Sequence, residues 1–169
     1  MEKFNNVLEL FGYLFKQLAE KKIDYFITGS YALNVYTVPR MTRDIDIAIF
    51  LNEKNFEIFL TIFSDGFYFN KTSILEDIKH FRLFNIICEE LSFKLDFIPK
   101  NQSQLSKAEF NTKRMEKVLN SQAYVISPEH LFIAKLSWIQ NSGSDYHIRD
   151  LQNLLFYPGI NREYIAKWI

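Results

Sequence analysis

The chain has 169 residues, of which 48% are hydrophobic and 17% aromatic, and its twenty basic and twenty acidic side chains give a formal net charge of zero. This length suits a single domain with a core of its own. The charge balance excludes the strongly basic character typical of nucleic-acid binders and the strongly acidic character that attracts cationic ligands. Charge therefore does not identify a partner.

Cysteine content and hydropathy indicate a compartment. The single cysteine, Cys88, excludes an intramolecular disulfide and suits a reducing environment. No apolar run reaches the roughly 20 residues that a membrane-spanning helix needs. The N-terminus is amphipathic, unlike the uninterrupted apolar region of a signal peptide. We expect a cytoplasmic protein with no membrane partner.

Hydrophobic periodicity predicts alternating helices and strands in the first half of the chain. Ser30 is expected to cap a short helix that ends before Pro39, because the residue before a proline is pushed out of helical geometry. The expected elements are a helix over Glu2–Lys21, a strand over Ile23–Thr28, a helix over Tyr31–Tyr36, a strand over Asp44–Leu51 and a helix over Glu53–Phe63.

The second half of the sequence predicts a β-hairpin, two further strands and a C-terminal part made of helices. Ser127 and Pro128 mark a helix start, as a serine cap followed by proline at the first helical position. Trp138 stands at helical spacing and is predicted to lie in the core. The expected elements are strands over 81–88, 91–98, 113–119 and 123–126, helices over 102–110, 128–140, 148–156 and 162–169, and a loop over 141–144. The fold class predicted is α+β, a small mixed β-sheet with flanking helices.

Two acids on the Asp44–Leu51 strand are the most informative feature. A strand has a side-chain period of two, so Asp44 and Asp46 share one face, with Cα atoms roughly 6.5–7 Å apart, while Ile45 and Ile47 face the core. At about 4 Å and an effective dielectric near 20, two such carboxylates repel by roughly 4 kcal/mol. Either solvent or a bound cation must offset this repulsion. Mg²⁺, which prefers oxygen ligands and phosphates, suits the second case.

The turn at Gly29 and Ser30 supplies a complementary feature. A glycine between a strand and a helix lets the backbone approach a ligand closely, and the free N–H groups at a helix start favour phosphate. Ser30 adds a hydroxyl donor. We therefore expect an anion site beside a cation site, which suits a metal–nucleoside triphosphate.

The order Gly29-Ser30, thirteen intervening residues, then Asp44-Ile45-Asp46 resembles the signature of the DNA polymerase beta-like nucleotidyltransferase superfamily. The Arg40-x-Thr42-x-Asp44 form is similar to the abortive-infection type of toxin nucleotidyltransferase. The resemblance implies a single nucleotidyltransferase-like domain over 1–169, with a core of about 23–127 and a C-terminal helical part of about 128–169.

The same resemblance implies a set of site residues. Asp96 matches a third acid, which would join Asp44 and Asp46 as metal ligands and catalytic residues and would take the proton from the acceptor hydroxyl. Asn153 stands where a second acid is common in the last helix of such proteins. Nucleotide-binding residues by this resemblance are Gly29, Ser30, Arg40, Thr42, Lys135 and Asp150.

Simpler interpretations stand beside these assignments. Lys135 would contact phosphate, with Asp150 orienting it, or would extend along the surface of an amphipathic helix. Arg40 and Arg43 would either neutralise the acidic pair or meet phosphate. Without the pair of Asp44 and Asp46, Asp96 would be interpreted as an aspartate with a structural role.

We expect a nucleotidyltransferase that moves a nucleoside monophosphate from an NTP, with Mg²⁺ or Mn²⁺ as cofactor. The acceptor is a tRNA end, a protein hydroxyl or a small molecule, and a toxin-like enzyme would have a cognate antitoxin as partner. The alternatives are a catalytically silent nucleotide-binding or partner-binding module, and a plain interaction protein in which the motif is coincidental.

Overall fold

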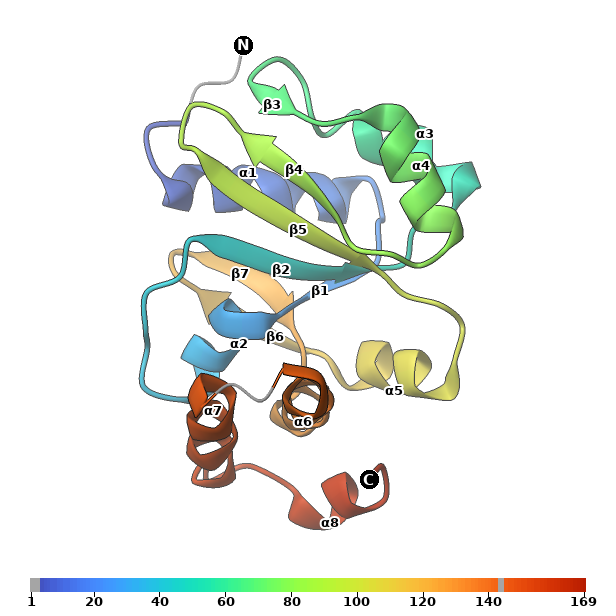
Figure 1. Cartoon of the computed structure of the whole chain (residues 1–169). Helices are drawn as coiled ribbons and strands as arrows, with labels where there is room; N and C mark the ends of the chain where they lie inside the picture. Colours follow the sequence, from blue (N-terminus) through green and yellow to red (C-terminus); the bar gives the residue numbers. More distant parts are fainter. Residues whose placement is uncertain (1–3, 143–144) are drawn as a thin grey trace.

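The computed structural model describes residues 4–142 and 145–169 (Figure 1). Within them, seven strands form one mixed sheet in the order β3-β4-β5-β2-β1-β7-β6. The strands are β1 Tyr25–Thr28, β2 Asp44–Ile49, β3 Phe67–Tyr68, β4 Phe84–Cys88, β5 Phe93–Pro99, β6 Arg114–Val118 and β7 Ser121–Val125. The helices are α1 Val7–Glu20, α2 Gly29–Tyr36, α3 Glu53–Leu60, α4 Lys71–Lys79, α5 Gln104–Thr112, α6 Pro128–Ser142, α7 Asp145–Leu155 and α8 Arg162–Ala166.

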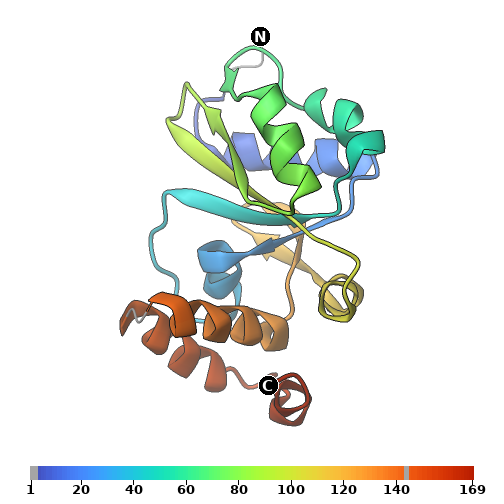
Figure 2. The ribbon, with the colours of Figure 1, turned by 45° about the vertical axis from the view of Figure 1, so that its right-hand side comes forward.

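The centre of the sheet combines both strand directions. β2 pairs antiparallel with β1 and parallel with β5, and β1 also pairs parallel with β7. The predicted hairpin of the strands 81–88 and 91–98 is present as the antiparallel pair β4–β5. Figures 1 and 2 show α1, α3 and α4 on one face of the sheet and the other helices on the opposite face. This confirms the predicted α+β class.

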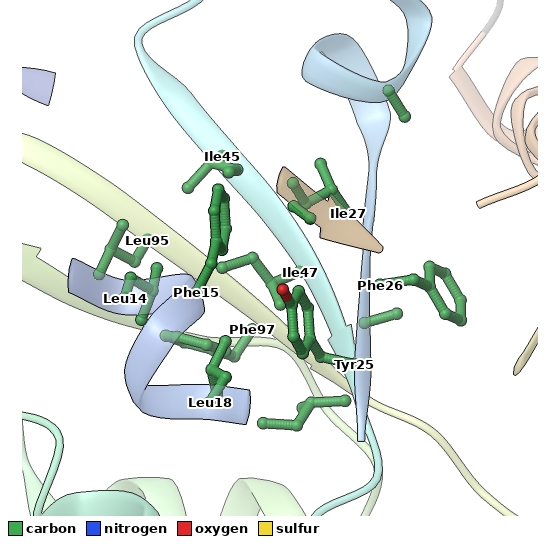
Figure 3. Packing of buried hydrophobic residues seen from close by; sticks show 14 of the residues in the cluster. Leu14, Phe15, Leu18, Tyr25, Phe26, Ile27, Ile45, Ile47, Leu95 and Phe97 are labelled. Carbon is green, nitrogen blue, oxygen red and sulfur yellow. The ribbon is translucent and has the colours of Figure 1, made fainter. Parts of the chain in front are cut away.

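The core between the sheet and α1 is apolar throughout. Ile45, Ile47, Leu95 and Phe97 are fully buried and face the apolar side of α1, as Figure 3 shows around Leu14, Phe15 and Leu18. Since alternate residues of a strand face opposite ways, Asp44, Asp46 and Asp96 lie on the other face of the sheet. The hydrophobic core thereby determines which face carries the acids.

Several predicted boundaries differ from the structure. β3 and α4 were not predicted, and α6 continues to Ser142 through the first half of the expected 141–144 loop. Residues 143–144 of that loop, and residues 2–3 of the first predicted helix, lie outside the described residues. Within the described part of the chain, no helix combines the length and apolar character needed to cross a membrane.

Candidate active site

Strand register brings the three predicted acids together. In the parallel β2–β5 pair, Asp46 lies opposite Asp96 and Asp44 lies opposite Lys94. In the antiparallel β1–β2 pair, Asp46 lies opposite Thr28, the residue before Gly29. The acids therefore converge beside the Gly29–Ser30 turn, although they come from strands about 50 residues apart in the sequence.

Gly29 is required by its contact with Asp46. Its φ is +64°, in the left-handed region that residues with a Cβ rarely adopt. A Cβ at this position would overlap Oδ2 of Asp46 and would lie 2.7 Å from its Cγ. The absence of a side chain at Gly29 is thus what allows the Asp46 carboxylate to sit against the start of α2.

Ser30 does not cap α2 as predicted. The helix begins at Gly29, and its N-cap, Thr28, makes no capping hydrogen bond through its side chain. The prediction failed because the left-handed glycine lets the helix start directly at the strand end. Ser30 Oγ instead accepts a hydrogen bond of 2.9 Å from Nη2 of Arg40.

Lys94 is an addition that the sequence did not single out. Its Nζ lies 2.7 Å from Oδ2 of Asp96 and 3.7 Å from Oδ2 of Asp44. Thr42 donates a hydrogen bond of 2.9 Å from Oγ1 to Oδ1 of Asp44, so the predicted nucleotide-binding threonine contacts an acid. The other Asp96 oxygen, Oδ1, is buried and has no hydrogen-bond partner among the described residues.

The electrostatics of the acids favour a cation. The pKa of Asp46 is raised to about 6, first by burial and then by the nearby Asp44 and Asp96, while Lys94 and Lys135 oppose the shift. Across the described part of the chain, no three His, Cys, Asp or Glu side chains are arranged together as a metal site. The donor set nevertheless fits a divalent cation in its chemistry, because it consists of carboxylate oxygens, one of them buried without a partner.

Lys135 and Asp150 form a buried ion pair at the same site. Lys135 Nζ lies 2.8 Å from Oδ2 of Asp150, and the two residues are 6% and 5% exposed. The surface interpretation of Lys135 is therefore wrong. Arg40 Nη2 reaches the same Asp150 oxygen at 3.4 Å and also contacts Ser30, so Arg40 joins α2 to α7 rather than pairing with Asp44 or Asp46.

Asn34 holds the segment that carries Arg40. Its side chain donates to the backbone oxygen of Arg40 at 2.8 Å and accepts from the backbone nitrogen at 2.9 Å. Because Asn34 and Arg40 are six residues apart across an irregular segment, no periodic pattern in the sequence indicates this role.

A cavity of about 340 Å³ connects the parts of the site. Gly29, Ser30, Asp46 and Lys135 line it together with an apolar group, namely Phe26, Ala48, Ile98, Ile126, Leu131 and Ala134. A second ion pair also lines the cavity, with Lys100 Nζ 2.6 Å from Oε2 of Glu109. Burial raises the pKa of Glu109, and Lys100 opposes the shift.

Trp138 was predicted to lie in the core, and that prediction is wrong. It is 61% exposed and lines the same cavity. Helical spacing places it on the cavity-facing side of α6, with Leu131 and Lys135, and the pattern alone does not distinguish a cavity from a core.

Solved structures share this architecture. The solution structure of the antibiotic-resistance factor ANT(2'')-Ia matches with a TM-score of 0.59 at 13% identity, over 95% of this chain and 88% of that one. The chain has the nucleotidyltransferase fold. At this level of identity, the likeness shows that the two chains share a fold.

Two further structures agree. The crystal structure of ANT(2'')-Ia in complex with adenylyl-2''-tobramycin has a TM-score of 0.58 at 11% identity, over 95% of this chain and 93% of that one. A provisionally assigned nucleotidyltransferase from Thermotoga maritima has a TM-score of 0.55 at 18% identity, over 86% and 92%. No protein-family profile matches the sequence, and no curated protein matches it.

Proposed function

We propose that this protein is a nucleotidyltransferase that moves a nucleoside monophosphate from an NTP onto an acceptor hydroxyl. The observation that carries the proposal is the contact between Asp46 and Gly29, beside Asp96 and Asp44, in a cavity that also reaches Lys135. It places a group of carboxylates next to the start of a helix. A metal-bound triphosphate needs both kinds of partner.

Asp44, Asp46 and Asp96 would hold the divalent cation, Mg²⁺ or Mn²⁺. When bound, such a cation neutralises charge on the phosphates and favours ionisation of the attacking hydroxyl. Thr42 orients the Asp44 carboxylate through its hydrogen bond. Lys94 supplies a positive charge between Asp44 and Asp96 and limits the repulsion between them.

The chain's other polar groups would bind the triphosphate. The first N–H groups of α2, at Gly29 and Ser30, favour phosphate oxygens. Lys135 would bind a phosphate with its ammonium group, which Asp150 holds in place. Arg40 supports both by contacting Ser30 and Asp150.

In the transfer itself, the acceptor oxygen forms a bond to the α-phosphorus, and the bond from that phosphorus to the bridging oxygen breaks. Pyrophosphate leaves, and the acceptor hydroxyl loses its proton. Asp96 is the residue we assign to take that proton, because it lies opposite Asp46 in the β2–β5 pair, within the group of carboxylates.

The acceptor is a small molecule, a tRNA end or a protein hydroxyl. The adenylyl-tobramycin complex of ANT(2'')-Ia supports the first class by fold analogy, and the Arg40-x-Thr42 form of the motif supports a toxin-like modifier with a cognate antitoxin. Incubating the protein with labelled NTPs and cell lysate, followed by fractionation, identifies which class takes up label.

Two acid variants test the proposal. Asp44→Ala and Asp46→Ala should each abolish transfer of label, while Asp65→Ala, which removes an exposed acid from a turn elsewhere, should leave it unchanged. Unaltered transfer by either site variant contradicts the proposal. Tight NTP binding by the wild-type protein without transfer to any fraction supports a catalytically silent nucleotide-binding module instead.

A further inference from the structure

Trp138 is an exposed aromatic side chain on the lining of the candidate nucleotide cavity. Large aromatic rings usually bury most of their surface, and an aromatic ring left open beside a ligand cavity often provides a contact for the ligand. Trp138 is 61% exposed. The exposure of Trp138 therefore calls for an explanation that the core does not give.

One face of α6 leads from the cavity interior to Trp138. Leu131, Ala134, Lys135 and Trp138 all line the cavity, at the i, i+3, i+4 and i+7 spacing of a single helix face. Leu131 is 1% exposed and Lys135 is 6% exposed, so the face opens towards solvent at Trp138. Trp138 follows Lys135 by three residues, which corresponds to a rise of about 4.5 Å along the helix.

A second observation at the same place involves His147 of α7. His147 lines the cavity with Trp138, and its Nδ1 is buried without a hydrogen-bond partner in the described part of the chain. Buried polar atoms in folded proteins are nearly always paired, so an unpaired ring nitrogen beside a cavity is a candidate ligand contact.

We propose that Trp138 is the stacking platform for the nucleobase of the NTP, with His147 as a hydrogen-bonding group beside it. The inference rests on the proposed function, which places the triphosphate at Ser30 and Lys135. A base has a flat π-face and polar edges, and one exposed indole with one unpaired imidazole nitrogen complements both. Stacking tolerates any base, so Trp138 would contribute affinity and position more than choice among the four NTPs.

The test uses Trp138 as its own reporter. In a Trp168→Phe background Trp138 is the only tryptophan, because the chain has two. Titration with Mg-ATP, Mg-GTP, Mg-CTP and Mg-UTP should change Trp138 fluorescence without any acceptor present. Magnesium tripolyphosphate, which has the phosphates but no base, should compete with the NTPs without producing that change.

Variants separate stacking from a structural role. Trp138→Ala should weaken NTP binding by about tenfold, within the range that one base–aromatic stack contributes, and should leave tripolyphosphate binding unchanged. Trp138→Phe should recover most of the loss, and His147→Ala should weaken NTP but not tripolyphosphate binding. Urea unfolding should show at most a small loss of stability for Trp138→Ala, because the side chain is 61% exposed.

The outcomes distinguish this inference from the proposed function. Equal NTP affinity in Trp138→Ala and wild type, or an equal loss for NTP and tripolyphosphate, overturns the stacking proposal and leaves the phosphate site standing. A fluorescence change that requires an acceptor assigns Trp138 to the acceptor and also overturns it. If wild type binds neither NTPs nor tripolyphosphate, the proposed function and the stacking proposal fail together.

Discussion

Gly29→Ala tests the contact on which the candidate site depends. The left-handed φ of +64° is expected to cost a residue with a Cβ about 1–2 kcal/mol. The new methyl group would also overlap Oδ2 of Asp46, so the carboxylate must leave its place, at a further cost of about 1 kcal/mol for a strained rotamer. We expect Gly29→Ala to lower the free energy of unfolding by about 2–3 kcal/mol.

Gly66→Ala is the matched control. Gly66 also has a positive φ, of +96°, but no heavy atom lies within 4 Å of the position its Cβ would take. This variant should show only the backbone effect, of about 1–2 kcal/mol, and should bind Mg-NTP like the wild type. Gly29→Ala should lose Mg-NTP binding as well as stability, because the methyl group displaces a proposed ligand.

Urea unfolding measures stability, and isothermal titration with Mg²⁺ and a non-hydrolysable NTP measures binding. The reasoning is refuted if Gly29→Ala binds Mg-NTP with wild-type affinity. It is also refuted if the two glycine variants are equally destabilised and equally competent in binding, since the overlap with Asp46 would then have no effect.

Two further predictions concern buried charges. In EDTA, Asp46→Asn should stabilise the protein, because a folded-state pKa of about 6, against an ordinary value of 3.8, penalises ionised Asp46 by up to about 3 kcal/mol. Because the pKa is raised in the folded state, the stability of the wild type falls as pH rises from about 4 through 6. The stability that Asp46→Asn gains over the wild type in urea unfolding should therefore be small near pH 4 and complete above pH 7. A variant that is less stable than the wild type at pH 8 contradicts this prediction. Lys135→Met should destabilise by about 3 kcal/mol, at the low end for a broken buried pair, because Arg40 Nη2 remains 3.4 Å from the same Asp150 oxygen. Adding Asp150→Asn should restore much of that stability but not NTP binding, and additive losses in the double variant would show that the pair is not coupled.

The sequence predicts the central part of the site because two of its three acids lie on one strand with a clear alternating pattern. In β2, buried isoleucines alternate with Asp44 and Asp46, so the face of each side chain follows from the period of a strand. Asp96 follows from the same alternation in β5, helped by the family resemblance. Strand order and register, which bring Asp96 opposite Asp46, are long-range features that no local pattern contains.

The errors have physical causes in particular segments. β3 has only two residues, and in α4 only Ile74 and Ile78 are buried, so neither gives a clear periodic signal. Lys100, which directly follows β5, and Glu109 of α5 both line the cavity, and their side chains meet only in the folded chain. No local pattern in the sequence therefore indicates this ion pair.

The ladder between β2 and β5 has a consequence for how this protein can evolve. Ile47 stands opposite Phe97, one step along from Asp46 and Asp96, so sliding the ladder by one residue would turn carboxylates inward and isoleucines outward. Mutational drift that keeps the chain foldable must therefore keep these backbone positions aligned, whether or not any catalysis is under selection. A descendant that lost its acids would keep this alignment of β2 and β5, so point mutations alone could restore carboxylates on the same face of the sheet.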